Sequence, residues 1–520
     1  MKNMSAYKRN FYILLLFVFS LILIYSPVVT NTYEYHDSFQ FINAYLSVGK
    51  PGIYQPFINV LIAGRSLYAL IYFYTIPFLM HGVETAWHVK FIGIITLGIS
   101  AYFLYRLFIK INYSRKSSAA ISILCFCLPG IQQFVYTSHT FPYTLSFPLV
   151  IFSFFFYLRF IKSINEGKLF STSLFLTLSL FLLTSSALLY QSVTECFLAL
   201  IFLNLISNSR QKTLDYIKNI FIGVLIYLIS ILLYISIHYI IDVPILRSSG
   251  ISLDSIFSSE RSIGINANIG WQTIGLFYER TIRAFSLWFY GSGKAAAYPV
   301  ILFFIMIQIG IILKKCNGNK HKKYFFGNFL ELVKVLGIFC LFTLASNIII
   351  FTQINDGLKL LFRTMIAYQW LILFYLLFLL SKIESEIDSP KILNLFRSLC
   401  IILVVLSGLT VSIRLYYNFV YPNKIEYSTI QNKLASNSMP LDGDICIINT
   451  RPIPDTPVSE YFVIDEFGRT TGSYWFDISS LISAAAKSKG ISLSNSRLLI
   501  EGAPDFSQNH CKLTIDIAGK

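Results

Sequence analysis

Charged residues are scarce in this chain: they make up 13% of its 520 residues, against 55% hydrophobic residues. A soluble globular protein carries roughly 25% charged residues, so this composition excludes a water-soluble protein of this size. The alternating pattern of a membrane barrel is also absent. Apolar stretches of about 18 or more residues recur instead, each able to cross a hydrocarbon core as a helix. Because backbone groups in lipid must satisfy one another, these stretches predict transmembrane helices.

Other features that the sequence lacks argue against further classes of function. The formal net charge is +16, but no basic groove or recognition motif accompanies it, which argues against nucleic acid as a partner. Six of the eight cysteines lie in apolar segments without metal-ligand spacing, as expected for small core residues. No small-x-small cleavage site follows the first apolar run, at 11–29. We therefore interpret that run as an uncleaved helix with its N-terminus in the cytoplasm.

The lysines and arginines cluster in turns between apolar runs, and these turns predict the topology. Five such turns lie at residues 106–116, 159–168, 210–218, 314–323 and 382–397. Cytoplasmic loops are enriched in these residues, and they favour a surface of anionic lipid, so we place all five inside. About eleven helices follow from this rule. They are expected at 11–29, 88–108, 119–136, 143–161, 169–189, 192–208, 219–241, 296–314, 328–350, 364–381 and 398–416.

One apolar run, at 57–80, does not fit the alternation. If it crossed the membrane, the basic turn at 106–116 would lie outside. Gly64-Arg65 and Pro77 also make a simple span unfavourable. We expect this run to lie at the outer interface or to be partly re-entrant.

The chain divides into a transmembrane domain, 1–416, with outward loops near 30–87 and 242–298, and a polar tail, 417–520. Short strands are expected in the tail at 445–449, 461–464, 498–501 and 513–517, with a helix at 478–489. If the tail is extracytoplasmic, Cys446 and Cys511 can form a disulfide. The predicted fold is thus an all-α polytopic membrane protein with a small C-terminal α/β domain in the periplasm.

The first outward loop opens with two carboxylates and an imidazole, Glu34, His36 and Asp37. A carboxylate partly shielded from water at the membrane surface can act as a general base. The same three side chains could hold a divalent metal, although their spacing does not establish one. The alternative is a solvated polar loop.

Further polar residues fall in apolar or outward segments. Cations that could grip a phosphate are Arg65, Arg280, Lys294 and Arg363. Residues that could hydrogen-bond a substrate are His139, Tyr190, Gln191 and Glu195. Polar contacts between helices are the alternative for Gln191 and Glu195, and headgroup contact is the alternative for Arg65.

Three of these motifs, in their order along the chain, resemble a known family. Tyr35-His36-Asp37, Gly64-Arg65 and Tyr190-Gln191 are similar to motifs of the serotype-converting O-antigen glucosyltransferases, which belong to the GT-C class of polytopic glycosyltransferases. Members often carry two adjacent acids where this chain has His36-Asp37, so the acidic role transfers to Asp37. The resemblance covers roughly residues 1–420 and does not extend to the tail.

The resemblance implies a polyprenyl-phosphate hexose, with glucose as the first expectation, as the donor. It implies an inverting transfer to O-antigen or lipopolysaccharide at the periplasmic face of a bacterial inner membrane. An O-antigen polymerase or ligase stays open as an alternative, although such enzymes would concentrate their cations in one large mid-chain loop. A transporter of lipid-linked glycans is a further alternative, but it would be expected to show matched halves, and no internal repeat is present.

Overall fold

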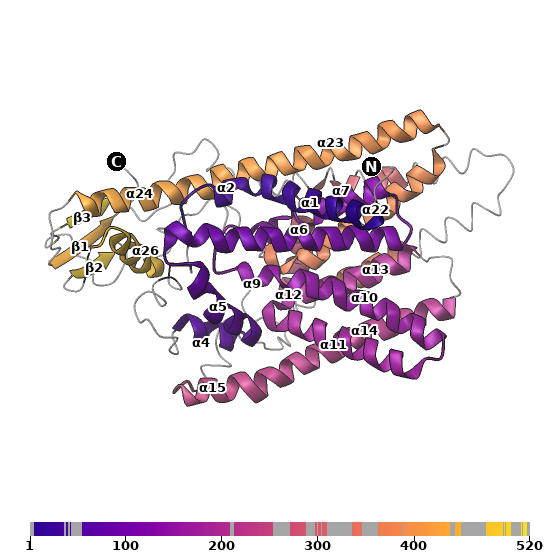
Figure 1. The fold of residues 1–520 in the computed structure, drawn as a ribbon, viewed down its shortest axis with the longest axis horizontal. Coiled ribbons are helices and arrows are strands. Elements are labelled where there is room, and N and C mark those ends of the chain that lie inside the picture. Colours follow the sequence, from indigo (N-terminus) through magenta and orange to yellow (C-terminus); the bar gives the residue numbers. More distant parts are fainter. Residues whose placement is uncertain are drawn as a thin grey trace.

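The architecture is that of a helical bundle with a small sheet beyond one end (Figure 1). The computed structural model describes residues 5–35, 38–39, 42, 55–207, 213–252, 271–287, 297–298, 300–302, 304–308, 335–345, 362–387, 389–436, 443–448, 475–491, 493, 496–500, 511 and 513–516. Within these residues most of the chain is helical, and the axes of the long helices are roughly aligned.

Within the described residues, 7 helices are long and apolar enough to cross a membrane. They are Tyr7–Ile24, Val83–Lys110, Phe141–Asn165, Leu169–Leu189, Ile217–Ser248, Ile366–Ser385 and Pro390–Ala435. Each overlaps a helix expected from the sequence, which confirms a multi-pass helical membrane protein. The expected total of about eleven stays a prediction, since much of 296–314 and 328–350 lies outside the described residues.

Serine pairs let two of the long helices approach closely. Helices α10 (Ser146–Asn165) and α11 (Leu169–Leu189) form an antiparallel pair. The hydroxyl of Ser153 donates to the carbonyl of Ser179 at 2.8 Å, and the hydroxyl of Ser179 donates back at 3.0 Å. Small hydroxyl residues of this kind are favoured where helices meet inside lipid.

The helix expected at 119–136 is not continuous, and that prediction was wrong. Helix α7 (Arg115–Cys125) ends early, and only one short turn, α8 (Pro129–Gln132), follows. The cause is Pro129, which lacks an N–H and pushes the preceding Leu128 into an extended conformation, with φ −66° and ψ 149°. A buried, irregular segment, 126–140, replaces the second half of the predicted helix.

Hydroxyl groups from the start of the chain satisfy part of this irregular backbone. Helix α1 (Ala6–Ile24) is followed by Tyr25, whose hydroxyl donates to the carbonyl of Phe126 at 2.7 Å. The hydroxyl of Tyr33 likewise donates to the carbonyl of Tyr136 at 2.9 Å. Irregular backbone at membrane depth is tolerated only where protein or a water-filled cavity surrounds it. These two tyrosines therefore help to make the 126–140 segment possible.

Two π-helical turns interrupt long helices, each shortly before a proline. One is η2 (His238–Asp242), which is followed two residues later by Pro244. The other is η5 (Tyr416–Val420), which is followed two residues later by Pro422. A proline inside an α-helix lacks the donor and clashes with the carbonyl four residues before it. The wider π turn relieves that conflict without ending the helix.

The last long helix is far longer than the expected 398–416. Helix α23 (Pro390–Leu415), the η5 turn and α24 (Tyr421–Ala435) follow one another without a break. Figure 1 shows them as one rod that runs along the bundle and reaches the sheet. Residue 416 thus marks a change in composition and not the end of a helix.

The small sheet is parallel. Strands β1 (Gly443–Ile448), β2 (Ser496–Ile500) and β3 (Leu513–Asp516) have the order β2-β1-β3. Helix α26 (Trp475–Ser488) packs against α24 and β2. Three of the four expected strands and the expected helix are therefore present, while 461–464 lies outside the described residues.

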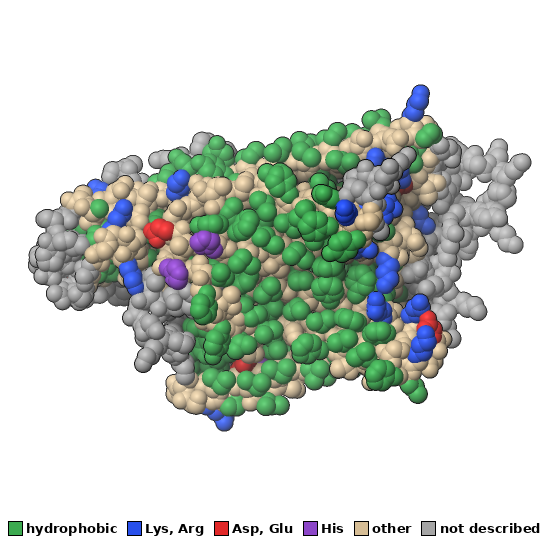
Figure 2. Space-filling model, viewed as in Figure 1, with side chains coloured by type: hydrophobic (Ala, Val, Ile, Leu, Met, Phe, Trp, Pro, Cys, Tyr) green, Lys and Arg blue, Asp and Glu red, His purple; other side chains and the backbone are tan. Residues whose placement is uncertain are grey.

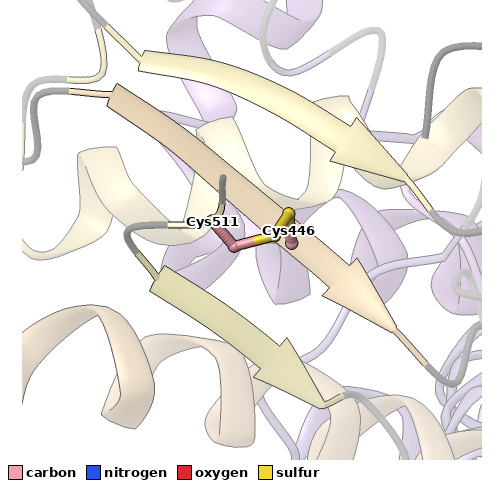
Figure 3. Close-up of a disulfide and its surroundings, with 2 residues drawn as sticks. All are labelled: Cys446 and Cys511. Atoms are coloured by element: carbon pink, nitrogen blue, oxygen red, sulfur yellow. A yellow bond between two sulfur atoms is a disulfide. The ribbon is translucent and has the colours of Figure 1, made fainter. Parts of the chain in front are cut away.

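The predicted disulfide is also present. Cys446 in β1 is joined to Cys511, which precedes β3, with 5.5 Å between their Cα atoms (Figure 3).

Basic turns that are far apart in the sequence meet at one end of the bundle. Ser114, in the turn after α6 (Ala86–Lys110), and Ser117, in the first turn of α7, both donate to the carboxylate of Glu384. That carboxylate pairs with Arg397 at 3.1 Å. Figure 2 shows Lys and Arg side chains gathered at the end of the molecule opposite the sheet. The turn at 314–323 lies outside the described residues.

Candidate functional site

Arg65 is the centre of a polar cluster at the other end of the bundle, where it lies between α4 (Gln55–Ile62) and α5 (Ser66–Leu79). Its Nη1 donates to the hydroxyl of Tyr143 at 2.6 Å, and its Nε donates to Oε1 of Gln191 at 3.4 Å. The guanidinium lies 4.8 Å from the ring centre of Tyr190 and is only half-buried. Arg65, Tyr190 and Gln191, singled out separately in the sequence, are thus in direct contact.

A glycine makes this contact possible. Gly64 has a φ of +68°, which breaks the 57–80 run into two helices. A Cβ on Gly64 would lie 2.3 Å from the hydroxyl oxygen of Tyr234, which comes from α14 (Thr213–Ile237). The two-helix arrangement agrees with the expectation that 57–80 is not a simple span. Its placement at the interface stays a prediction.

Gln191 stabilises the break between α4 and α5. Its Nε2 donates to the carbonyl of Ala63 at 2.9 Å and to the hydroxyl of Tyr234 at 2.6 Å. Its Oε1 accepts from Arg65, so both ends of the amide are engaged. These contacts suit Gln191 to orienting Arg65, and its predicted contact with a sugar hydroxyl stays a prediction.

His139 extends the cluster toward the first outward loop. Its Nδ1 lies 2.8 Å from the hydroxyl of Ser38, and its carbonyl accepts from the hydroxyl of Tyr68 at 2.6 Å. The Tyr68 ring in turn lies 5.0 Å from the ring of Tyr143. His139 is the least buried side chain between 126 and 144. His36 and Asp37, which directly precede Ser38, lie outside the described residues.

Glu34 is buried in an ion pair. Its Oε1 lies 3.0 Å from Nζ of Lys90, both side chains are almost fully buried, and its Oε2 accepts from the N–H of Ser138 at 3.3 Å. Lys90 also donates to the carbonyl of Tyr33 at 2.8 Å. This engagement suits a role in positioning the first loop, and the predicted catalytic role of Glu34 beside Asp37 stays a prediction. Lys90 was not predicted as part of the site, although a lysine inside the apolar run 88–108 is the signal that indicates it.

Arg280 lies fully buried on α17 (Trp271–Phe285). Its Nη1 and Nη2 donate to the hydroxyl and the carbonyl of Thr364, each at 3.0 Å. Burial lowers the pKa of Arg280 to about 10, and the carboxylate of Glu195 acts in the opposite direction. The guanidinium therefore stays charged at neutral pH.

Glu195 lies at the break between α12 (Gln191–Thr194) and α13 (Cys196–Ser207). Only 5% of it is exposed, and its Oε2 has no hydrogen-bond partner in the part of the chain that the structure describes. The helix expected at 192–208 corresponds to the apolar helical run Gln191–Ser207, with this acid at the junction of α12 and α13. A buried acid facing Arg280 suits either a substrate contact or internal charge balance.

Arg363 joins the same region through its backbone. It belongs to η4 (Phe362–Thr364), and its N–H donates to Oε1 of Gln133 at 3.2 Å. The charges of Arg363 and Arg65 both act on the hydroxyl of Tyr190. Two arginines thus lie near the α11–α12 turn, a setting suited to an anion such as phosphate, and Arg280 lies buried beside Thr364, the neighbour of Arg363. Lys294, the fourth predicted cation, lies outside the described residues.

No group of three metal-ligating side chains occurs among the described residues. The possible metal site at Glu34, His36 and Asp37 depends on two residues outside them and stays a prediction.

Comparison with known proteins adds no assignment. No family model matches the chain, and no curated protein matches it significantly. The resemblance to the O-antigen glucosyltransferases therefore depends on its three short motifs, two of which meet at Arg65.

Proposed function

We propose that the chain is a membrane glycosyltransferase that moves a hexose from a polyprenyl-phosphate donor to an O-antigen glycan. The observation that carries the proposal is the cluster of Arg65, Tyr143, Tyr190 and Gln191 at the end of the bundle opposite the basic turns. A charged guanidinium held between aromatic rings, on a residue that is not fully buried, is suited to bind a phosphate.

The positive-inside rule supports a periplasmic location for this cluster. If the end with the basic turns faces the cytoplasm, the N-terminus lies inside, and Arg65, the sheet and the C-terminus lie outside. A lipid-borne donor would then reach Arg65 from the outer leaflet of a bacterial inner membrane. Membrane lipids and the acceptor glycan are the remaining partners.

The proposed chemistry uses two kinds of charged group, a carboxylate that accepts a proton and cations that stabilise the leaving phosphate. Asp37 takes the proton of the acceptor hydroxyl, whose oxygen attacks the anomeric carbon from the face opposite the phosphate. The bond from that carbon to the phosphate oxygen breaks, and its electron pair stays on the phosphate. Arg65, with Arg363, Arg280 and Lys294 as further cations, stabilises the departing phosphate. Glu34 positions the loop that carries Asp37.

The test is surface-glycan analysis of cells that express the chain, Asp37→Asn or Arg65→Gln, with equal membrane levels confirmed. We expect the unchanged chain to add a hexose branch and both variants to add little. Arg247→Gln, at an exposed arginine of α15 (Val243–Ser248), is the matched control and should retain activity.

Two outcomes would contradict the proposal in different ways. Full activity of Asp37→Asn would remove the role of Asp37 and leave the enzyme class. Failure of the unchanged chain across several O-antigen types would instead favour a polymerase, a ligase or a transporter.

A further inference from the structure

A buried histidine and aspartate form a pair within the π turn η2. Nδ1 of His238 lies 2.9 Å from Oδ2 of Asp242. Asp242 is fully buried, and His238 is 7% exposed. The intervening Tyr239, Ile240 and Ile241 are 52%, 72% and 48% exposed, so the polar pair faces the protein while its apolar neighbours face outward.

The pair is only partly satisfied. Oδ1 of Asp242 is buried and has no hydrogen-bond partner among the described residues. Nδ1 of His238 is engaged by the carboxylate, which leaves Nε2 as the nitrogen available to a ligand. A buried ionisable group without full compensation is costly, and in membrane segments such groups mark functional sites. Single π turns within α-helices are also frequent at functional sites.

The pair lies next to the Arg65 cluster. Tyr234, one helical turn before His238, accepts from Gln191 and donates to the carbonyl of Ala63 at 3.3 Å. Helix α4, which ends just before Arg65, packs against η2 and α15. His238 therefore lies one helical turn from a tyrosine that contacts the break at Gly64-Arg65, in the π turn that packs against α4.

We propose that Nε2 of His238 donates a hydrogen bond to the phosphate of the polyprenyl donor beside Arg65, with Asp242 orienting the ring. This inference rests on the proposed function. A phosphate oxygen that accepts from Nε2 leaves the contact between Nδ1 and Asp242 in place, so one ring can serve both partners.

The charge balance of the transfer explains why a hydrogen-bond donor at the phosphate would help. The phosphodiester of the donor carries one negative charge, and the leaving polyprenyl phosphate gains a second when the bond to the anomeric carbon breaks. The proton lost by the acceptor goes to Asp37. A hydrogen-bond donor at the phosphate, already aligned by Asp242, stabilises the charge that develops there.

Two substitutions of His238 separate a phosphate contact from a structural role. The amide nitrogen of His238→Asn takes the place of Nδ1 and keeps the bond to Asp242, but nothing replaces Nε2. The amide of His238→Gln reaches the place of Nε2 and gives up the bond to Asp242. Ser236→Ala is the matched control, because Ser236 is exposed and, among the described residues, its hydroxyl bonds only to the carbonyl of Leu232 on its own helix.

The measurement is binding of undecaprenyl monophosphate to the purified full chain in lipid nanodiscs, with undecaprenol as the probe without phosphate. We expect His238→Asn to weaken binding of the phosphate by about tenfold to a hundredfold, the cost of one charge-assisted hydrogen bond. His238→Gln should lose less, Ser236→Ala should bind like the unchanged chain, and undecaprenol should not distinguish the variants.

The outcomes distinguish this inference from the proposed function. If the unchanged chain binds the phosphate and His238→Asn binds it equally well, the inference is wrong and the proposed function stands. If His238→Gln loses more than His238→Asn, the pair is structural. If the unchanged chain does not bind undecaprenyl monophosphate at all, the proposed donor is wrong and the inference fails with it.

Discussion

At the scale of single residues, the site is built from polar groups, each of which would be costly to bury alone in an apolar environment. Arg65 is held by the hydroxyl of Tyr143, the amide of Gln191 and the face of the Tyr190 ring. A guanidinium is costly at membrane depth unless it is paired or functional. Its contacts with neutral groups orient it and leave its charge available to an anion.

Gly64→Ala should disorganise this cluster. The new Cβ would lie 2.3 Å from the hydroxyl oxygen of Tyr234, at a residue whose φ is +68°. Gly167→Ala is a well-matched control, because Gly167 has the same φ of +68° and nothing within 4 Å of a built Cβ. Each variant should lose about 1–2 kcal/mol of stability from the strained backbone, and Gly64→Ala should lose more, together with its transfer activity.

Thermal unfolding in detergent and glycan analysis measure the two effects. Equal behaviour of Gly64→Ala and Gly167→Ala would mean that Tyr234 moves aside freely and does not hold the break in place.

The sequence predicted the residues of the site better than their partners. Arg65, Tyr190 and Gln191 stood out because each is polar in an apolar or outward segment, and the structure brings them together. Tyr143 and Tyr234 were missed, since tyrosines are common in this chain and only the fold shows which hydroxyls face Arg65. The His238–Asp242 pair carried a signal that was overlooked: a spacing of four residues shortly before Pro244.

At the scale of elements, the chain combines long regular helices with a buried irregular segment, 126–140. Hydrophobic length predicted the regular helices well, because a hydrocarbon core imposes about the same length on each. It failed at 119–136, where Pro129 ends the helical pattern but the apolar character continues. Hydropathy does not distinguish a buried turn from a lipid-facing helix, since both exclude charge.

Tyr25→Phe should destabilise the irregular segment, because the carbonyl of Phe126 would lose the donor that now lies 2.7 Å away. An unsatisfied buried group costs about 1–3 kcal/mol, and the corresponding fall in thermal stability can be measured in detergent. Tyr105→Phe is the matched control. Tyr105 is buried too, with its ring against Phe17, but it donates no hydrogen bond within the described residues. A similar small effect of both substitutions would argue that the segment does not depend on Tyr25.

At the scale of the whole molecule, the bundle is polarised. The described basic turns meet at one end, while the arginine cluster and the sheet lie toward the other. Charge counting from the sequence anticipated this separation, because the bias of Lys and Arg between loops is a property of the entire chain. Which end faces the cytoplasm stays a prediction.

A periplasmic reporter fused after Lys520 should be active, because the count of helices places the C-terminus outside. The same topology predicts that Cys446 and Cys511, joined in the structure, resist alkylation in intact cells until a reductant is added. Alkylation of both thiols without reductant, together with a reporter active only in the cytoplasm, would reverse the proposed orientation.

The rod of α23, η5 and α24 connects the bundle to the sheet. Because it is one continuous helix, its number of residues sets how α24 is rotated about the helix axis. Lys424 donates to the side chain of Asn31 at 3.1 Å, and Tyr427 donates to Glu84 at 3.3 Å. One residue inserted before Tyr421 would turn α24 by about 100° and separate both pairs. Seven would restore nearly the same phase but would move α24 about 10 Å along its axis, which would also separate both pairs. The contacts between α24 and the bundle therefore fix both the phase and the length of this helix.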